Sequence, residues 1–167
     1  MCIRDRHKDL NPEFIFMLPS YNVRNNEISA IIGINQLKRL DKNVKMRNDN
    51  FSYFLDKLDN RKYFVEFDRV GMSNYALNLV LKQKDSILFK KLKKSLSNNK
   101  IEYRIGSAGG GNQLRQPYLK SYIDKNKIDP TSFCNTEHIH FYGMYLGNYP
   151  DLKKENLDYI LSKVNNL

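Results

Sequence analysis

The sequence lacks the features that mark secreted and membrane proteins. Its 167 residues include two cysteines, Cys2 and Cys134, too few for a disulfide framework, so we expect a cytoplasmic protein. No run of about 18 apolar residues is present, which predicts no membrane partner and no membrane-spanning segment. The charged N-terminus is not followed by the apolar stretch of a secretory signal. With 41% apolar and 28% charged residues, the composition is that of a globular chain with a core for one domain.

Acidic residues are relatively few: the chain has 18 Asp and Glu but 28 Lys and Arg, which gives a net charge of +10. Such an excess can indicate a nucleic-acid partner. However, the chain has 19 Lys, 9 Arg and 20 Asn, a bias typical of an AT-rich genome. Lys90, Lys91, Lys93 and Lys94 would face several sides of one short helix. We therefore expect a solvated lysine face and no nucleic-acid partner. The alternative is a non-enzymatic basic module that binds nucleic acid or another polyanion.

The first third of the chain divides into two segments. Residues 1–12 are predicted to be an irregular, non-native N-terminus, and Met1 to Arg6 resemble a translated sequencing adapter, so we expect a fragment of a longer protein. Within 13–60, a short apolar run ends at Pro19-Ser20, and Asn25 or Asn26 can cap a helix. The helical spacing of Leu37, Leu40, Val44, Phe51, Leu55 and Leu58 predicts one long helix. Its start, 28–34, is apolar nearly all round, so a second domain or subunit should cover it.

Residues 61–167 are predicted to form a small α/β domain. Strands are expected at 63–67, 75–81, 101–105 and 141–146. Helices are expected after caps at Asp85 and Asp151, with a short helix over 114–123. This order predicts an α/β sandwich attached to the long connecting helix.

A glycine-rich turn, 106–112, is the first candidate site. Its bare backbone amides could close around an anion, although it matches neither the Walker A pattern nor GxGxxG. The following residues, 113–118, place Arg115, two amides and Tyr118 beside it, which suits a phosphorylated or hydroxyl-rich ligand. The alternative is a flexible turn.

Other polar residues give weaker signals. Cys134, His138 and His140 lack a fourth ligand at zinc spacing, so no metal is expected. On a strand, His138 could line a ligand pocket or be structural. Asn22 and Arg24 precede the apolar start of the long helix, where Asn22 could cap a helix or contact a ligand across an interface. No arrangement of residues indicates a catalytic nucleophile.

Several blocks of sequence together carry a family resemblance. The DegT/DnrJ/StrS sugar aminotransferases resemble this chain at Pro19-Ser20-Tyr21-Asn22-Val23-Arg24, at Glu27-Ile28-x-Ala30-x-x-Gly33-x-x-Gln36-Leu37-x-x-Leu40-Asp41 and at Arg47. Pro19-Ser20 departs from the aromatic-Gly step of that family, and Ile31 replaces an Ala. The blocks 109–118 (GGGNQLRQPY) and 138–150 (HIHFYGMYLGNYP) resemble the branch that includes the CDP-4-keto-6-deoxy-glucose 3-dehydrases. The resemblance covers about residues 13 to 165.

The resemblance implies that 61–167 are the C-terminal small domain of a fold-type-I enzyme dependent on pyridoxal 5'-phosphate. Residues 13–60 would then be a segment from the large domain and the long connecting helix. The parent would be a homodimer acting on a nucleotide-linked 4-keto-6-deoxy sugar, by transamination or C3 deoxygenation. Its Schiff-base lysine, or the histidine replacing it, would lie upstream, which implies that this fragment alone is inactive. Asn22 would contact the cofactor phosphate of the opposite subunit. Contacts to the nucleotide-sugar substrate are expected from Arg24, Arg104, Asn112, Arg115, Tyr118 and His138.

Overall fold

A computed structural model describes residues 26–105 and 111–167. The chain divides into two compact units, 1–38 and 39–167. In the first unit, α1 (Glu27–Leu37) begins as the sequence predicts, because the Asn26 side chain caps it by accepting a 2.9 Å hydrogen bond from the Ser29 amide. Glu27 lies in the first turn, where its charge favours the positive end of the helix dipole.

The prediction of one continuous helix is wrong. α1 ends at Leu37, and α2 (Leu40–Lys57) starts after Arg39, whose backbone (φ −118°, ψ 6°) is not helical. Lys38 and Arg39 both have good helix propensity. The helical spacing of apolar residues also continues through the break, so the sequence gives no sign of it.

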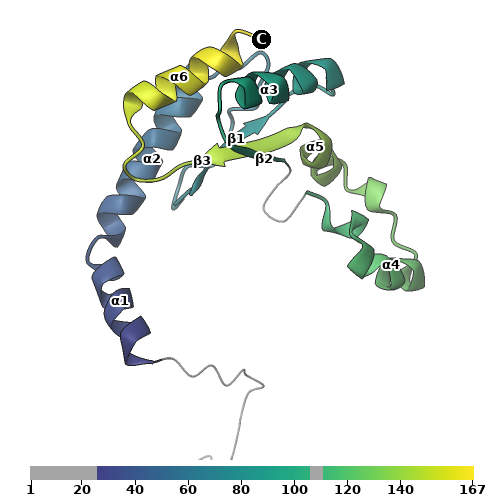
Figure 1. The fold of residues 1–167 in the computed structure, drawn as a ribbon. Coiled ribbons are helices and arrows are strands. Elements are labelled where there is room, and N and C mark those ends of the chain that lie inside the picture. The colour runs from purple at the N-terminus through teal and green to yellow at the C-terminus, as the bar shows by residue number, and fades with distance from the viewer. Residues whose placement is uncertain (1–25, 106–110) are drawn as a thin grey trace, which may run out of the picture. The chain divides into compact units, whose positions relative to one another are not determined.

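Three antiparallel strands form the sheet of the second unit (Figure 1). They are β1 (Ala76–Val80), β2 (Tyr103–Ile105) and β3 (Gly143–Gly147), in the order β1-β3-β2. Leu77 lies opposite Leu146, and Leu146 lies opposite Tyr103, which fixes the register. Three of the four expected strands are confirmed. The strand expected over 63–67 is wrong, because only Tyr63 makes a bridge, to Leu81, and its aromatic neighbours pack within a loop.

Three helices cover one face of this sheet and close the core. They are α2, α3 (Ser86–Asn98) and α6 (Lys154–Asn165). The buried side chains include Phe51, Phe54, Leu92, Leu96, Leu157, Val164 and, from the sheet, Leu77, Leu79 and Met144. A mixed helix and sheet domain is thus confirmed. No helix within 26–105 or 111–167 is long and apolar enough to cross a membrane.

The two predicted aspartate caps have different outcomes. Asp85 caps α3 by accepting hydrogen bonds from the Ile87 and Leu88 amides, as predicted. Asp151 does not cap α6, because the helix starts at Lys154 after a turn closed by the Leu152 amide and the Tyr149 carbonyl. That turn buries Leu152, and the helix starts two residues later than a cap at Asp151 would place it. On α3, Lys90, Lys91 and Lys94 are exposed, which agrees with the predicted lysine face.

Residues 112–142 run as short helical pieces. The expected helix over 114–123 is replaced by 3₁₀ turns η2 (Gln113–Arg115) and η3 (Pro117–Leu119), followed by α4 (Lys120–Asn126). Pro117 lacks the amide hydrogen that a continuous helix needs. After η4 (Pro130–Ser132) comes α5 (Cys134–Tyr142). His138 therefore does not lie on a strand, as its predicted role in a pocket assumed, because it and His140 lie on this helix.

Candidate functional site

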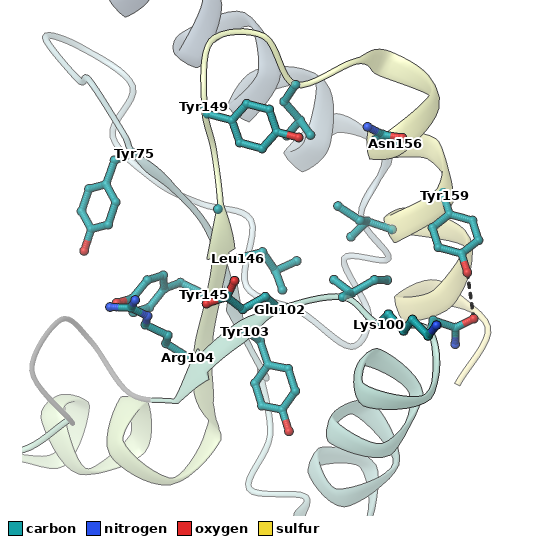
Figure 2. A pocket seen from close by; sticks show the side chains of 15 residues that line it. Tyr75, Lys100, Glu102, Tyr103, Arg104, Tyr145, Leu146, Tyr149, Asn156 and Tyr159 are labelled. Carbon is teal, nitrogen blue, oxygen red and sulfur yellow. Dashed lines mark hydrogen bonds between the residues drawn. The ribbon is translucent and has the colours of Figure 1, made fainter.

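A tyrosine-lined cavity of about 570 Å³ lies beside strands β2 and β3 (Figure 2). Five of the chain's 11 tyrosines line it: Tyr75, Tyr103, Tyr145, Tyr149 and Tyr159. Aromatic faces combined with arginine and amide groups can contact bases and sugars. The cavity can therefore receive a small, partly aromatic or hydroxyl-rich ligand.

Arg104 is an exposed cation of this cavity, and the strand register fixes its position on the sheet. It lies directly opposite Tyr145, which in turn lies opposite Asn78, so the three form a row across the sheet. Because their neighbours Leu77 and Leu146 point into the core, this row faces the other side. The rings of Tyr75 and Tyr145 meet edge to face with centroids 5.9 Å apart. A hydrogen bond to Tyr145 raises the pKa of Tyr75, while the Arg104 charge acts to lower it.

The row lies next to a position without a side chain. Gly147 ends β3, and a Cβ placed there would meet open space. Gly143 at the other end of the strand is different, because a Cβ would lie 2.6 Å from the Ile139 carbonyl oxygen of α5. The bare end of the strand therefore leaves room beside Tyr75 and Tyr145.

His138 lines a second cavity, of about 720 Å³, between α5, the end of β1 and the loop at 64–67. Its Nε2 atom lies 2.6 Å from the Leu81 carbonyl oxygen. Since a carbonyl only accepts, Nε2 carries the proton in this contact. His138 therefore joins α5 to the end of β1, while its ring borders the cavity.

Glu137 of α5 binds two of the predicted site residues. Its Oε1 accepts from Asn112 Nδ2 at 2.6 Å and from Arg115 Nε at 2.7 Å, and its Oε2 accepts from Arg115 Nη2. The Arg115 guanidinium also lies over the Phe141 ring, 5.1 Å from its centroid. The hydrogen bonds from Arg115 and Asn112 lower the pKa of Glu137 to about 2. The carboxylate is thus ionised at neutral pH.

Asn112 is fully buried and held on every side. Besides Glu137, its amide nitrogen donates to the Pro130 carbonyl, and its Oδ1 accepts from the Leu114 amide. Its backbone amide donates to Nδ1 of His140 at 3.1 Å. The preceding residue, Gly111, has φ +85°, and a Cβ there would lie 2.3 Å from the same Nδ1 atom. Position 111 therefore requires glycine, because any larger residue would collide with His140 of α5.

The described residues thus place the predicted contacts in three separate places. Arg104 lies in the tyrosine-lined cavity, and His138 lies in the second cavity. Asn112, Arg115 and Tyr118 share the segment 112–118, where the exposed Tyr118 donates to Gln113 Oε1 at 2.6 Å. Asn22, Arg24 and residues 106–110 of the glycine-rich turn lie outside the described residues.

Sequence reasoning missed two residues. Glu137 was not singled out, although Glu137, His140 and Phe141 have the i, i+3, i+4 spacing of one helix face. Asn148 follows the central strand and is buried, a position where a polar side chain needs partners. Among the described residues, no group of three or more acidic, histidine or cysteine side chains could hold a metal ion.

The DegT/DnrJ/EryC1/StrS aminotransferase family matches residues 4–165. The chain belongs to this family. It is similar to a GDP-4-keto-6-deoxy-D-mannose 3-dehydratase of Escherichia coli O55:H7, with 32% identity over 88% of this chain and 37% of that protein. The lipopolysaccharide biosynthesis protein RfbH of Salmonella typhimurium is 31% identical over 86% of this chain and 32% of that protein. The chain thus spans between 32% and 37% of the lengths of these two curated relatives.

Solved structures of family members share the fold. A GDP-4-keto-6-deoxymannose 3-dehydratase with a trapped PLP-glutamate geminal diamine matches with a TM-score of 0.70 and 29% identity, over 96% of this chain and 40% of that one. The H188N variant of the dehydratase ColD with bound GDP-perosamine has a TM-score of 0.67 and 27% identity, over 92% of this chain and 39% of that one. The family resemblance inferred from the sequence motifs is confirmed.

Proposed function

We propose that the chain is the C-terminal small domain of a pyridoxal-phosphate-dependent aminotransferase or 3-dehydratase. Its substrate would be a nucleotide-linked 4-keto-6-deoxy sugar, in a route to deoxy or amino sugars of surface polysaccharides. The family match over residues 4–165 carries this proposal. Two relatives named as 3-dehydratases act on a GDP-linked sugar by their names, which supports the dehydratase side. The sequence blocks resemble a branch that includes CDP-linked 3-dehydrases, but they do not predict which nucleotide the substrate carries.

The described residues do not by themselves form a cofactor site. A Schiff-base lysine needs a desolvated amine, whereas the lysines that line the two cavities, Lys82, Lys84 and Lys100, are exposed. When bound, pyridoxal phosphate supplies an electron sink for bond cleavage beside its ring. We therefore assign to the described residues the binding and orientation of the sugar nucleotide, and to Asn22 the contact with the cofactor phosphate.

The proposed substrate contacts fall into two kinds, charged groups that bind phosphate and other side chains that contact the sugar or base. Arg104 and Arg115 would pair with phosphate oxygens, for which a planar guanidinium is suited. Tyr118, exposed on η3, would contact the sugar or base, and His138 would border the ligand from the second cavity. Asn112 would act by fixing its segment, because its side chain already makes three hydrogen bonds. Arg24 completes the proposed set.

The whole protein is proposed to be a cytoplasmic homodimer. In α1, the side chains of Ile28, Ile31, Ile32 and Ile34 are between 56% and 72% exposed. Contiguous apolar side chains of this kind usually mark an interface. These exposed isoleucines support the proposal that another domain or a second subunit covers the start of this helix.

The test uses the complete reading frame that encodes this chain in its genome. We expect the purified protein to convert GDP- or CDP-4-keto-6-deoxy sugars when given pyridoxal phosphate and glutamate. The 167-residue chain alone should show no cofactor absorbance and no turnover. A cofactor trapped by borohydride on one of its lysines would contradict the assignment of the Schiff-base residue to another part of the protein.

The polyanion alternative is tested by binding. The exposed lysines of α3 would give steep salt dependence with a mixed-sequence oligonucleotide. Steep salt dependence without competition from GDP-mannose or CDP-glucose would favour that alternative. Competition by the nucleotide sugars would favour the enzyme.

A further inference from the structure

Glu137 holds together two residues that lie on a segment with little other support. The residues from Gln113 to Leu119 form two 3₁₀ turns and take part in no sheet pairing. Such turns have few backbone hydrogen bonds, so side-chain anchors determine their conformation. One carboxylate, 14% exposed, accepts from both Asn112 and Arg115.

The anchoring contacts come from one face of α5. Glu137, His140 and Phe141 are three and four residues apart, so they point the same way. Glu137 accepts hydrogen bonds from Nε and Nη2 of Arg115, and the Phe141 ring lies against the guanidinium. His140 accepts from the Asn112 backbone amide. Each of these contacts fixes an orientation of the segment relative to α5.

The Arg115–Glu137 pair contributes more to orientation than to stability. The Arg115 side chain is 36% exposed, and partly solvated ion pairs add little to the free energy of unfolding. A bidentate pair nevertheless sets the plane of the guanidinium. The direction in which Arg115 presents its remaining edge is thus set by Glu137.

We infer that Glu137 is a positioning residue: it holds Arg115 and Asn112 in the arrangement that segment 112–118 presents to the sugar nucleotide. This inference rests on the proposed function. Glu137 itself does not touch the substrate, because its carboxylate is occupied by the two residues that it orients.

The test compares Glu137→Gln with Asp56→Asn in the complete protein. Asp56→Asn removes another carboxylate paired with an arginine, Arg69, away from the segment. We expect Glu137→Gln to raise the KM for the nucleotide sugar about tenfold, the loss typical of one charge-assisted hydrogen bond, with a smaller change in kcat. Hydrogen exchange in the peptide 111–119 should become several-fold faster. Asp56→Asn should change neither, and a melting curve should show that both variants are still folded at the assay temperature.

A double variant shows whether Glu137 acts through Arg115. If it does, the increases in KM caused by Arg115→Lys and Glu137→Gln should be strongly non-additive. The double variant should exceed Arg115→Lys alone only by the part that Glu137 exerts through Asn112. Additive increases in KM, or an unchanged exchange rate at 111–119, would overturn the inference. If the unmodified protein turns over no nucleotide sugar, the proposed function fails. Hydrogen exchange then decides the anchoring role by itself.

Discussion

The side-chain amide of Asn148 lies 3.0 Å from the carbonyl oxygen of Arg47, 101 residues earlier in the chain. The same amide nitrogen donates to the Asn74 carbonyl at 2.9 Å, and its Oδ1 accepts from Asn50. One buried side chain thus ties the end of β3 to α2 and to the residues before β1. It orients the sheet that carries Tyr145 and Arg104.

Replacing Asn148 should therefore destabilise the whole unit. Asn148→Ala removes the amide that donates to two partly buried carbonyls, and we expect a loss of about 1–3 kcal/mol in the free energy of unfolding. Asn148→Asp should cost at least as much, because it places an acceptor against two acceptors. Urea unfolding monitored by circular dichroism measures both. A loss below about 0.5 kcal/mol, the size of an exposed substitution, would show that water replaces the amide.

A second prediction concerns the end of α3. Lys100 has φ +56° and closes the helix, with its own amide bonded to the Ser97 carbonyl and the Ile101 amide bonded to the Leu96 carbonyl. Glycine usually occupies this left-handed position. Lys100→Gly should raise the free energy of unfolding by about 0.5–1 kcal/mol, since relief of strain exceeds the added entropy of the unfolded chain.

The matched control for Lys100 is Lys91→Gly, an exposed site inside the same helix. There glycine should lower stability by about 1 kcal/mol. Opposite signs at the two positions would establish the backbone argument. A loss of stability at both positions would contradict it.

The sequence predicted most elements of the core because each carries a clear local pattern. Alternating apolar residues marked β1, and the Asp85 cap with Leu92 and Leu96 marked α3. The strand predicted at 63–67 is absent because Phe64 and Phe67 pack against each other within a loop. The break at Lys38-Arg39 was not predicted because both residues have good helix propensity, so the local sequence carries no stop signal there.

The candidate site was predicted only in outline. Arg115 and Asn112 were found from a sequence block, yet their common partner Glu137 lies 22 residues beyond Arg115. No local pattern joins the two. The Arg104–Tyr145 pairing likewise depends on sheet order, because β2 pairs with a strand that follows it by some 40 residues.

The acid dependence of stability gives a third prediction. The pKa of Glu137 falls from its ordinary 4.5 to about 2 in the folded protein, mainly because Arg115 donates to it. A lowered folded-state pKa adds stability above pH 4.5, and this contribution is lost as the pH falls from 4.5 towards 2. The stability difference between the unmodified protein and Glu137→Gln should therefore be constant near neutral pH and shrink over that range. A difference independent of pH would contradict the pairing.

The last prediction concerns the exposed isoleucines of α1. Ile32 is 57% exposed among Ile28, Ile31 and Ile34, so in water the 167-residue chain should associate through this surface. Ile32→Asp places a charge in its middle and should shift sedimentation towards the monomer and reduce binding of an apolar dye. Ile87→Asp is the control, because Ile87 is 68% exposed on α3 without a comparable apolar cluster on its helix. Equal effects of the two substitutions would mean that added charge alone improves solubility, and a monomeric unmodified chain at high concentration would show that α1 is no interface.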